Sequence, residues 1–73
     1  MFKIRINKDN FEWPNPTITG KDVLDLVKKD AAKNAAYEFI KGKPQRVQLD
    51  QTVDLTDPGV ERFETLPLDQ TEG

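Results

Sequence analysis

One stretch of the sequence, residues 19–29, has a clear helical period, and this limits what the rest of the chain can be. At a turn of about 100° per residue, one arc of this helix collects the apolar side chains of Val23, Leu24, Leu26, Val27 and Ala31. Thr19 is placed to cap the helix by accepting a hydrogen bond from the backbone N–H of Asp22. We predict that the helix ends between Lys29 and Ala32. An isolated helix of about three turns is marginal in water, so its apolar arc must pack on a sheet.

The strands of that sheet are predicted from short runs in which apolar and polar residues alternate, as in a strand with one buried face. Residues 2 to about 18 are expected to form a hairpin with its turn at Lys8-Asp9-Asn10. Its second strand contains Pro14 and Pro16, so it should be an edge strand. Further short strands are predicted over residues 37–40, 46–49 and 62–66, with a turn at 42–44 and a long connection over 50–59 that contains Asp57-Pro58-Gly59.

This order of elements predicts an α+β fold, in which one helix crosses one face of a mixed sheet of four or five strands. The first and last strands should be central and parallel. We expect one domain over residues 1–67 and a flexible C-terminal tail over residues 68–73. Val53 and Leu55 should anchor the long connection, and Ile18 should point inward before the helix. The predicted core comprises Phe2 or Ile4, with Ile6, Trp13, Val23, Leu24, Val27, Leu49, Leu55 and Phe63.

Composition narrows the possible functions of this 73-residue chain. It contains no cysteine and no histidine, so thiol chemistry, the usual zinc ligands and the commonest general base are missing. We therefore expect no enzyme activity, no metal site and no cofactor. With 11 basic and 13 acidic residues, the net charge of −2 argues against nucleic acid as a partner. The sequence shows no signal peptide and no membrane span, so a cytoplasmic domain is expected.

Four segments carry a family resemblance: Phe2-Lys3-Ile4-Arg5-Ile6-Asn7, Thr17-Ile18-Thr19-Gly20, Val53-Asp54-Leu55 and Pro58-Gly59-Val60-Glu61-Arg62-Phe63-Glu64-Thr65. Together with the order of elements, they resemble the prokaryotic multiubiquitin domain. This resemblance implies a ubiquitin-like β-grasp fold. Members are bacterial ubiquitin-like proteins whose genes lie beside those for an activating enzyme, a conjugating enzyme and a JAB-type metalloprotease, and these enzymes are the implied partners.

The resemblance also implies a protein modifier that acts through its C-terminal carboxylate. The carboxylate of Gly73 would be adenylated with ATP, passed to a thiol of a partner enzyme, and joined to target proteins by an isopeptide or ester bond. Glycine suits this position because it has no Cβ to obstruct attack in a narrow active site. The residues that would carry Gly73 into the enzyme are Leu68, Asp69, Gln70, Thr71 and Glu72. Ubiquitin and sulfur-carrier proteins end in paired glycines, so Glu72 disfavours a sulfur-carrier role.

Two alternatives remain beside the conjugated modifier. The chain could be a non-covalent ubiquitin-like binding module, or one unit of a tandem ubiquitin-like precursor that is cut after Gly73. A binding module needs an exposed surface, and residues 37–40 offer one, because Tyr37, Phe39 and Ile40 cannot all point inward from one strand. We predict a partner-binding patch formed by Phe39, Leu66 and Leu68, although the tail could equally cover it.

Overall fold

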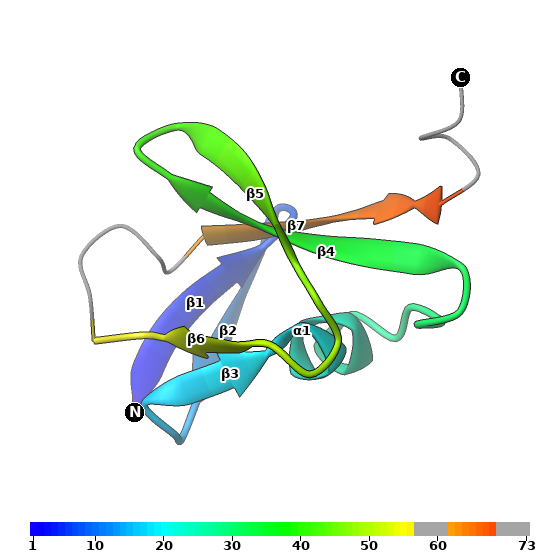
Figure 1. Ribbon diagram of the computed structural model, residues 1–73. Coiled ribbons are helices and arrows are strands. Elements are labelled where there is room, and N and C mark those ends of the chain that lie inside the picture. The colour runs from blue at the N-terminus through cyan, green and yellow to red at the C-terminus, as the bar shows by residue number, and fades with distance from the viewer. Residues whose placement is uncertain (57–61, 69–73) are drawn as a thin grey trace.

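The computed structural model describes residues 1–56 and 62–68, and a mixed sheet forms the centre of this part of the chain (Figure 1). Within these residues, five strands lie in the order β2 (Asp9–Trp13), β1 (Phe2–Ile6), β7 (Arg62–Pro67), β4 (Asn34–Ile40) and β5 (Lys43–Val47). Strands β1 and β7 pair in parallel and the other neighbours are antiparallel. Helix α1 (Gly20–Leu26) and a two-stranded sheet of β3 (Thr17–Thr19) and β6 (Thr52–Asp54) cover one face. The predicted ubiquitin-like β-grasp, with its first and last strands inside the sheet, is confirmed.

The first hairpin is tighter and shorter than the sequence predicted. Its register pairs Phe2 with Trp13 and Ile6 with Asp9, so the turn lies at residues 7–8 and not at 8–10. Asn7 takes the left-handed conformation, with φ of 60°, that this turn requires. The edge position of β2 is confirmed, but both prolines follow the strand, where they bend the chain toward the second sheet. The indole N–H of Trp13 donates to the carbonyl oxygen of Thr17 across this bend at 2.7 Å.

Helix α1 begins where predicted and ends earlier. Thr19 Oγ1 accepts from the backbone N–H of Asp22, and Asp22 Oδ2 accepts from the backbone N–H of Thr19, each at 3.1 Å, which completes a capping box. The predicted end between residues 29 and 32 is wrong. The backbone N–H of Lys28 donates to the Asp25 carbonyl and that of Lys29 to the Leu24 carbonyl, with Lys28 at φ of 58°. These bonds form a Schellman motif, which terminates the helix at Leu26 even without a glycine.

The sequence correctly predicted that the later segments form strands, but the bounds of two of them differ from the prediction. Strand β4 begins at Asn34, three residues earlier than expected, and its turn to β5 lies at Lys41 and Gly42, which both have positive φ. Strand β5 covers residues 43–47 and not 46–49. It tolerates Pro44 because it is an edge strand. The last strand agrees with its prediction, whereas Asp57-Pro58-Gly59 lies outside the described residues.

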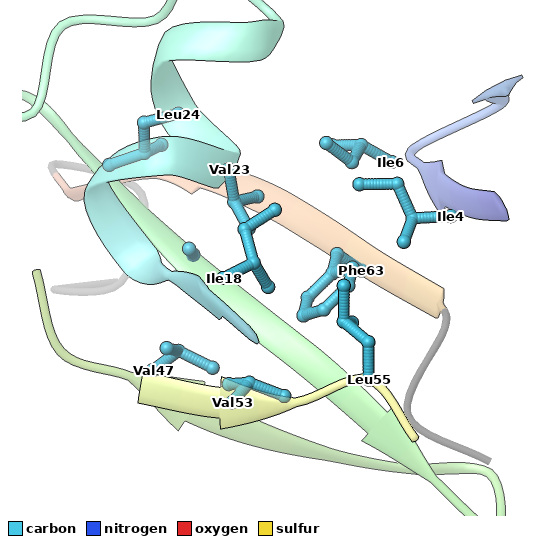
Figure 2. Close-up of a cluster of buried hydrophobic side chains, with 10 residues drawn as sticks. Ile4, Ile6, Ile18, Val23, Leu24, Val47, Val53, Leu55 and Phe63 are labelled. Carbon is cyan, nitrogen blue, oxygen red and sulfur yellow. The ribbon is translucent and has the colours of Figure 1, made fainter. Parts of the chain in front are cut away.

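The core lies between the covered face of the sheet, α1 and the second sheet (Figure 2). Its buried members are Ile4, Ile6, Ile18, Val23, Leu24, Ala36, Val47, Val53, Leu55 and Phe63. The inward position of Ile18 and the two anchors at residues 53 and 55 are therefore confirmed. Three predicted core residues, Phe2, Trp13 and Val27, are only half-buried. Leu49 was wrongly assigned to the core, since it is 45% exposed and its backbone carbonyl caps α1 by accepting from Lys21.

Candidate functional site

The face of the sheet opposite the helix is where the sequence predicts a binding surface. Neighbouring residues of a strand point to opposite faces, and the buried residues Ala36 and Phe63 mark the core side of β4 and β7. We call the opposite side the outer face. In β1, β4, β5 and β7 it comprises Lys3, Arg5, Ala35, Tyr37, Phe39, Pro44, Arg46, Arg62, Glu64 and Leu66.

Two residues of the predicted patch, Leu66 and Phe39, lie on this face but at opposite ends of the paired strands β4 and β7. Leu66, which is 41% exposed, lies opposite Ala35, and Phe39 follows Ala35 four residues later along β4. At about 3.3 Å per residue, this separation is about 13 Å. The pair of Tyr37 and Glu64 lies between them. The outer face is therefore a row of half-buried aromatic side chains with an exposed leucine at one end.

Phe39 has a partner that the sequence did not suggest. The guanidinium carbon of Arg62 lies 4.9 Å from the centroid of the Phe39 ring. This is a cation–π contact, and it also fixes the direction of the guanidinium group over the ring. The register of β4 with β7 explains it, because Glu38 pairs with Phe63 and the next pair outward brings these two residues together.

The third patch residue, Leu68, lies where the chain leaves the sheet. Strand β7 ends at Pro67, which pairs with Asn34, and the backbone N–H of Leu68 then donates to the carbonyl oxygen of Lys33 at 2.8 Å. This bond holds the exit of the chain against the loop before β4. Leu68 is half-buried. The other predicted tail residues, Asp69, Gln70, Thr71 and Glu72, and the predicted reactive Gly73 lie outside the described residues.

Two carboxyl groups have shifted pKa values, and neither belongs to the predicted patch. Glu38 points to the core side of β4, where it is 7% exposed and its Oε2 has no hydrogen-bond partner among the described residues. Burial raises the pKa of Glu38 above its ordinary value. The side-chain hydroxyl and backbone N–H of Thr56 both donate to Asp54, and these bonds lower the pKa of Asp54.

Other kinds of site can be assessed over the same part of the chain. Residues 1–56 and 62–68 contain no group of three or more acidic, histidine or cysteine side chains that could hold a metal ion. No helix in these two segments has the length and apolar character needed to cross a membrane. The outer face and the exit of β7 are therefore the features on which a functional argument can be built.

Sequence reasoning missed the basic side chains of the outer face. The sequence pattern places Lys3 and Arg5 in the first strand and Arg62 in the last strand, but it did not bring them together. The sequence did contain a signal for this cluster. The first and last strands were predicted to be central and parallel, and such pairing brings their outward-facing residues together. In the structure Arg5 is the register partner of Arg62.

Comparison with known proteins agrees with this architecture. No curated protein and no solved structure matches the chain significantly. A family model does match, and the match covers every strand and the helix described above. It spans residues 2–67, and by this match the chain belongs to the Multiubiquitin family.

Proposed function

We propose that this chain is a ubiquitin-like protein modifier that is activated at the carboxylate of Gly73 and conjugated to target proteins. Membership of the Multiubiquitin family is the observation that supports the proposal most strongly. In the proposed reaction, an activating enzyme joins the carboxylate to AMP and releases pyrophosphate. A thiol of the activating or conjugating enzyme then displaces AMP, and a nucleophile of the target displaces that thiol. A JAB-type metalloprotease would process or remove the modifier.

The position of β7 fits this role. Strand β7 pairs with β1 at Arg62 and Phe63, and with β4 from Phe63 to Pro67. The residues from 68 to 73 follow directly, and six residues can span at most about 20 Å when extended. With β7 held in the sheet and a short C-terminal segment after it, an enzyme would be able to bind the globular part while the carboxylate enters its active site.

The experiment is ATP–pyrophosphate exchange with the cognate activating enzyme. The full chain should support exchange, and deletion of Gly73 should abolish it, because Glu72 would then present a bulky second carboxylate beside the reacting group. Thr71→Ala, which keeps the terminal glycine, is the matched control and should retain exchange. Both variants should unfold like the parent, since the described core ends at Phe63. Exchange at the normal rate after deletion of Gly73 would refute the proposal.

A variant with one residue added after Gly73 tests the tandem-precursor version of this proposal. The extended chain should be inactive in exchange until the JAB-type metalloprotease removes the added residue. Recovery of exchange after protease treatment supports processing at Gly73. Exchange by the extended chain without any protease would contradict the need for a free glycine carboxylate.

A non-covalent binding module is the second candidate, and the exposed Leu66 on the outer face favours it. Leu66→Ser should weaken binding to the activating or conjugating enzyme while leaving thermal unfolding nearly unchanged. Leu49→Ser is a matched control, because Leu49 is similarly exposed, at 45% against 41%, and lies off the main sheet. Binding that needs Leu66, in a chain that supports no ATP–pyrophosphate exchange, would favour the module over the modifier.

A further inference from the structure

Three basic side chains gather at one end of the outer face. Lys3 and Arg5 project from β1, and Arg62 projects from the neighbouring β7 as the register partner of Arg5. All three line one open depression together with Ile4 and Asn10. We call Lys3, Arg5 and Arg62 the basic cluster.

No ion pair joins the basic cluster to an acidic side chain within the described part of the protein. In residues 1–56 and 62–68, the one salt bridge joins Lys21 to Asp25 on α1, away from this face. Glu12 is the register partner of Lys3, yet the two make no ion pair. Like charges placed side by side on paired strands destabilise a sheet. A chain with a net charge of −2 therefore places three positive charges close together, with no ion pair among the described residues to offset their repulsion.

From this geometry we infer that the basic cluster binds an extended acidic segment of a partner protein. Lys3 and Arg5 are two residues apart on one strand, a spacing of about 7 Å, which matches alternate side chains of an extended peptide. The guanidinium group of Arg62 is already ordered over Phe39, so less conformational entropy is lost when it binds a carboxylate. An adjoining depression lined by Lys3, Asn10 and Glu12 extends this surface toward the edge strand β2.

The surroundings favour a short acidic peptide over nucleic acid. Glu12 lies beside Lys3, and Glu64 follows Arg62 on the same face of β7, so carboxylates flank the cluster on two sides. They would repel a long polyphosphate chain, whereas a segment with a few carboxylates fits between them. The site is separate from the exit of the chain, because Arg62 begins β7 and Pro67 ends it. The inference therefore does not depend on activation of Gly73.

The test uses a short fluorescein-labelled peptide in which glutamate alternates with valine, and a control peptide in which glutamine replaces glutamate. Fluorescence anisotropy should show binding of the acidic peptide alone, and binding should weaken as salt is added. The double substitution Arg5→Glu and Arg62→Glu should reduce the affinity about tenfold or more. The double substitution Lys29→Glu and Lys33→Glu makes the same change in net charge away from the basic cluster, since Lys33 adjoins the end of β4 that pairs with Pro67. It should leave the affinity within about twofold.

A neutral pair, Arg5→Gln and Arg62→Gln, guards against a folding artefact, and each variant is checked by thermal unfolding. Amide chemical shifts of the parent protein should move on β1 and at the start of β7 when the peptide is added. The inference is overturned if the parent does not bind the peptide, if both charge-reversed variants bind alike, or if the shifts map elsewhere. Tighter binding of single-stranded oligonucleotide than of the acidic peptide would also overturn it and assign the cluster to nucleic acid.

Discussion

Asn7 and Thr65, which are 58 residues apart in the sequence, are joined by two hydrogen bonds. Asn7 Nδ2 donates to Thr65 Oγ1 at 3.1 Å, and Asn7 Oδ1 accepts from the backbone N–H of Thr65 at 2.9 Å. The backbone N–H of Asn7 also donates to the carbonyl oxygen of Phe63 at 2.8 Å. One residue thus shapes the first turn and extends the pairing between β1 and β7, which links the two ends of the domain.

Asn7→Ala should destabilise the protein by about 1–3 kcal/mol, because the partly buried N–H of Thr65 loses its acceptor and alanine resists positive φ. Asn7→Asp keeps the acceptor and should cost less. Asn7→Gly loses the same side-chain bonds but tolerates φ of 60°, so it should fall between the other two. Urea unfolding of the three variants measures this order. An equal effect of Ala and Asp would show that the bond to Thr65 contributes nothing.

Val23→Asp should unfold the domain at room temperature. Val23 is fully buried, and an unpaired carboxylate there costs several kcal/mol against a net stability of about 5 kcal/mol for a small domain. Val27→Asp is the comparison, since Val27 is only half-buried at the end of α1 and should leave a folded protein. Circular dichroism melts of both variants test the helix face. A cooperative melt for Val23→Asp would contradict it.

Gly20→Ala should destabilise the protein although alanine is the better helix former. A Cβ at this position would collide with the carbonyl oxygen of Gln48 and lie 2.8 Å from that of Val47. Both neighbours are backbone atoms, so neither can rotate away. A lower midpoint of thermal unfolding is expected, against the gain of about 1 kcal/mol that helix propensity alone predicts. A rise in the midpoint would mean that the connection after β5 can move aside.

Lys28→Gly should stabilise the protein, by at most about 1 kcal/mol. Lys28 has φ of 58°, a conformation that costs a residue with a Cβ roughly 1–2 kcal/mol and costs glycine little. Part of the gain is lost to the greater freedom of glycine in the unfolded chain. Urea unfolding provides the measurement, with Lys29→Gly as control, because Lys29 has no positive φ and its change should destabilise. Destabilisation by both would argue against strain at residue 28.

Glu38→Gln should raise the stability near neutral pH and have less effect in mild acid. Burial raises the pKa of Glu38 in the folded protein, so the folded state binds more protons than the unfolded state between the two pKa values. The contribution of this carboxyl group is therefore most favourable below its ordinary pKa, and it is lost as the pH rises through the folded pKa. Glutamine resembles the protonated form at every pH.

Urea unfolding of Glu38→Gln and of the parent protein, near neutral pH and in mild acid, measures this difference. Glu12→Gln serves as control because Glu12 is exposed on the edge strand. The gain for Glu38→Gln should shrink on acidification, whereas the control should show no such trend of comparable size. If the gain in stability is the same at both pH values, it does not arise from ionisation of Glu38.

Local patterns in the sequence predicted most of the fold. Period-two alternation located the first and last strands, and the cap at Thr19 located the start of α1, because both signals lie within a few neighbouring residues. The end of α1 was missed because it depends on a lysine in a left-handed conformation, which glycine or asparagine usually adopts. Leu49 was wrongly placed in the core. The segment that contains it is held to α1 by the backbone carbonyl of Leu49 and not by its side chain.

The candidate site was harder to predict than the fold. The alternation of residues 37–40 correctly required that some of them face away from the core, yet it gave no register between β4 and β7. Without that register, Phe39 could be matched with Leu66 but not with Arg62. The proximity of Arg5 to Arg62 likewise comes from strand order, which is a property of the whole chain. The roles of Gly73 and of the patch residues stay predictions.

The central place of β7 has a consequence for biosynthesis. β1, made first, and β4, made midway, are joined in the sheet only through β7, so a ribosome-bound chain lacks the middle of its sheet until residues 62–67 have emerged. Pairings over such long separations also form slowly. A nascent copy therefore exposes its apolar strands until residues 62–67 have left the ribosome. The complete sheet can therefore form only after the strand from which the C-terminal residues extend is free to pair.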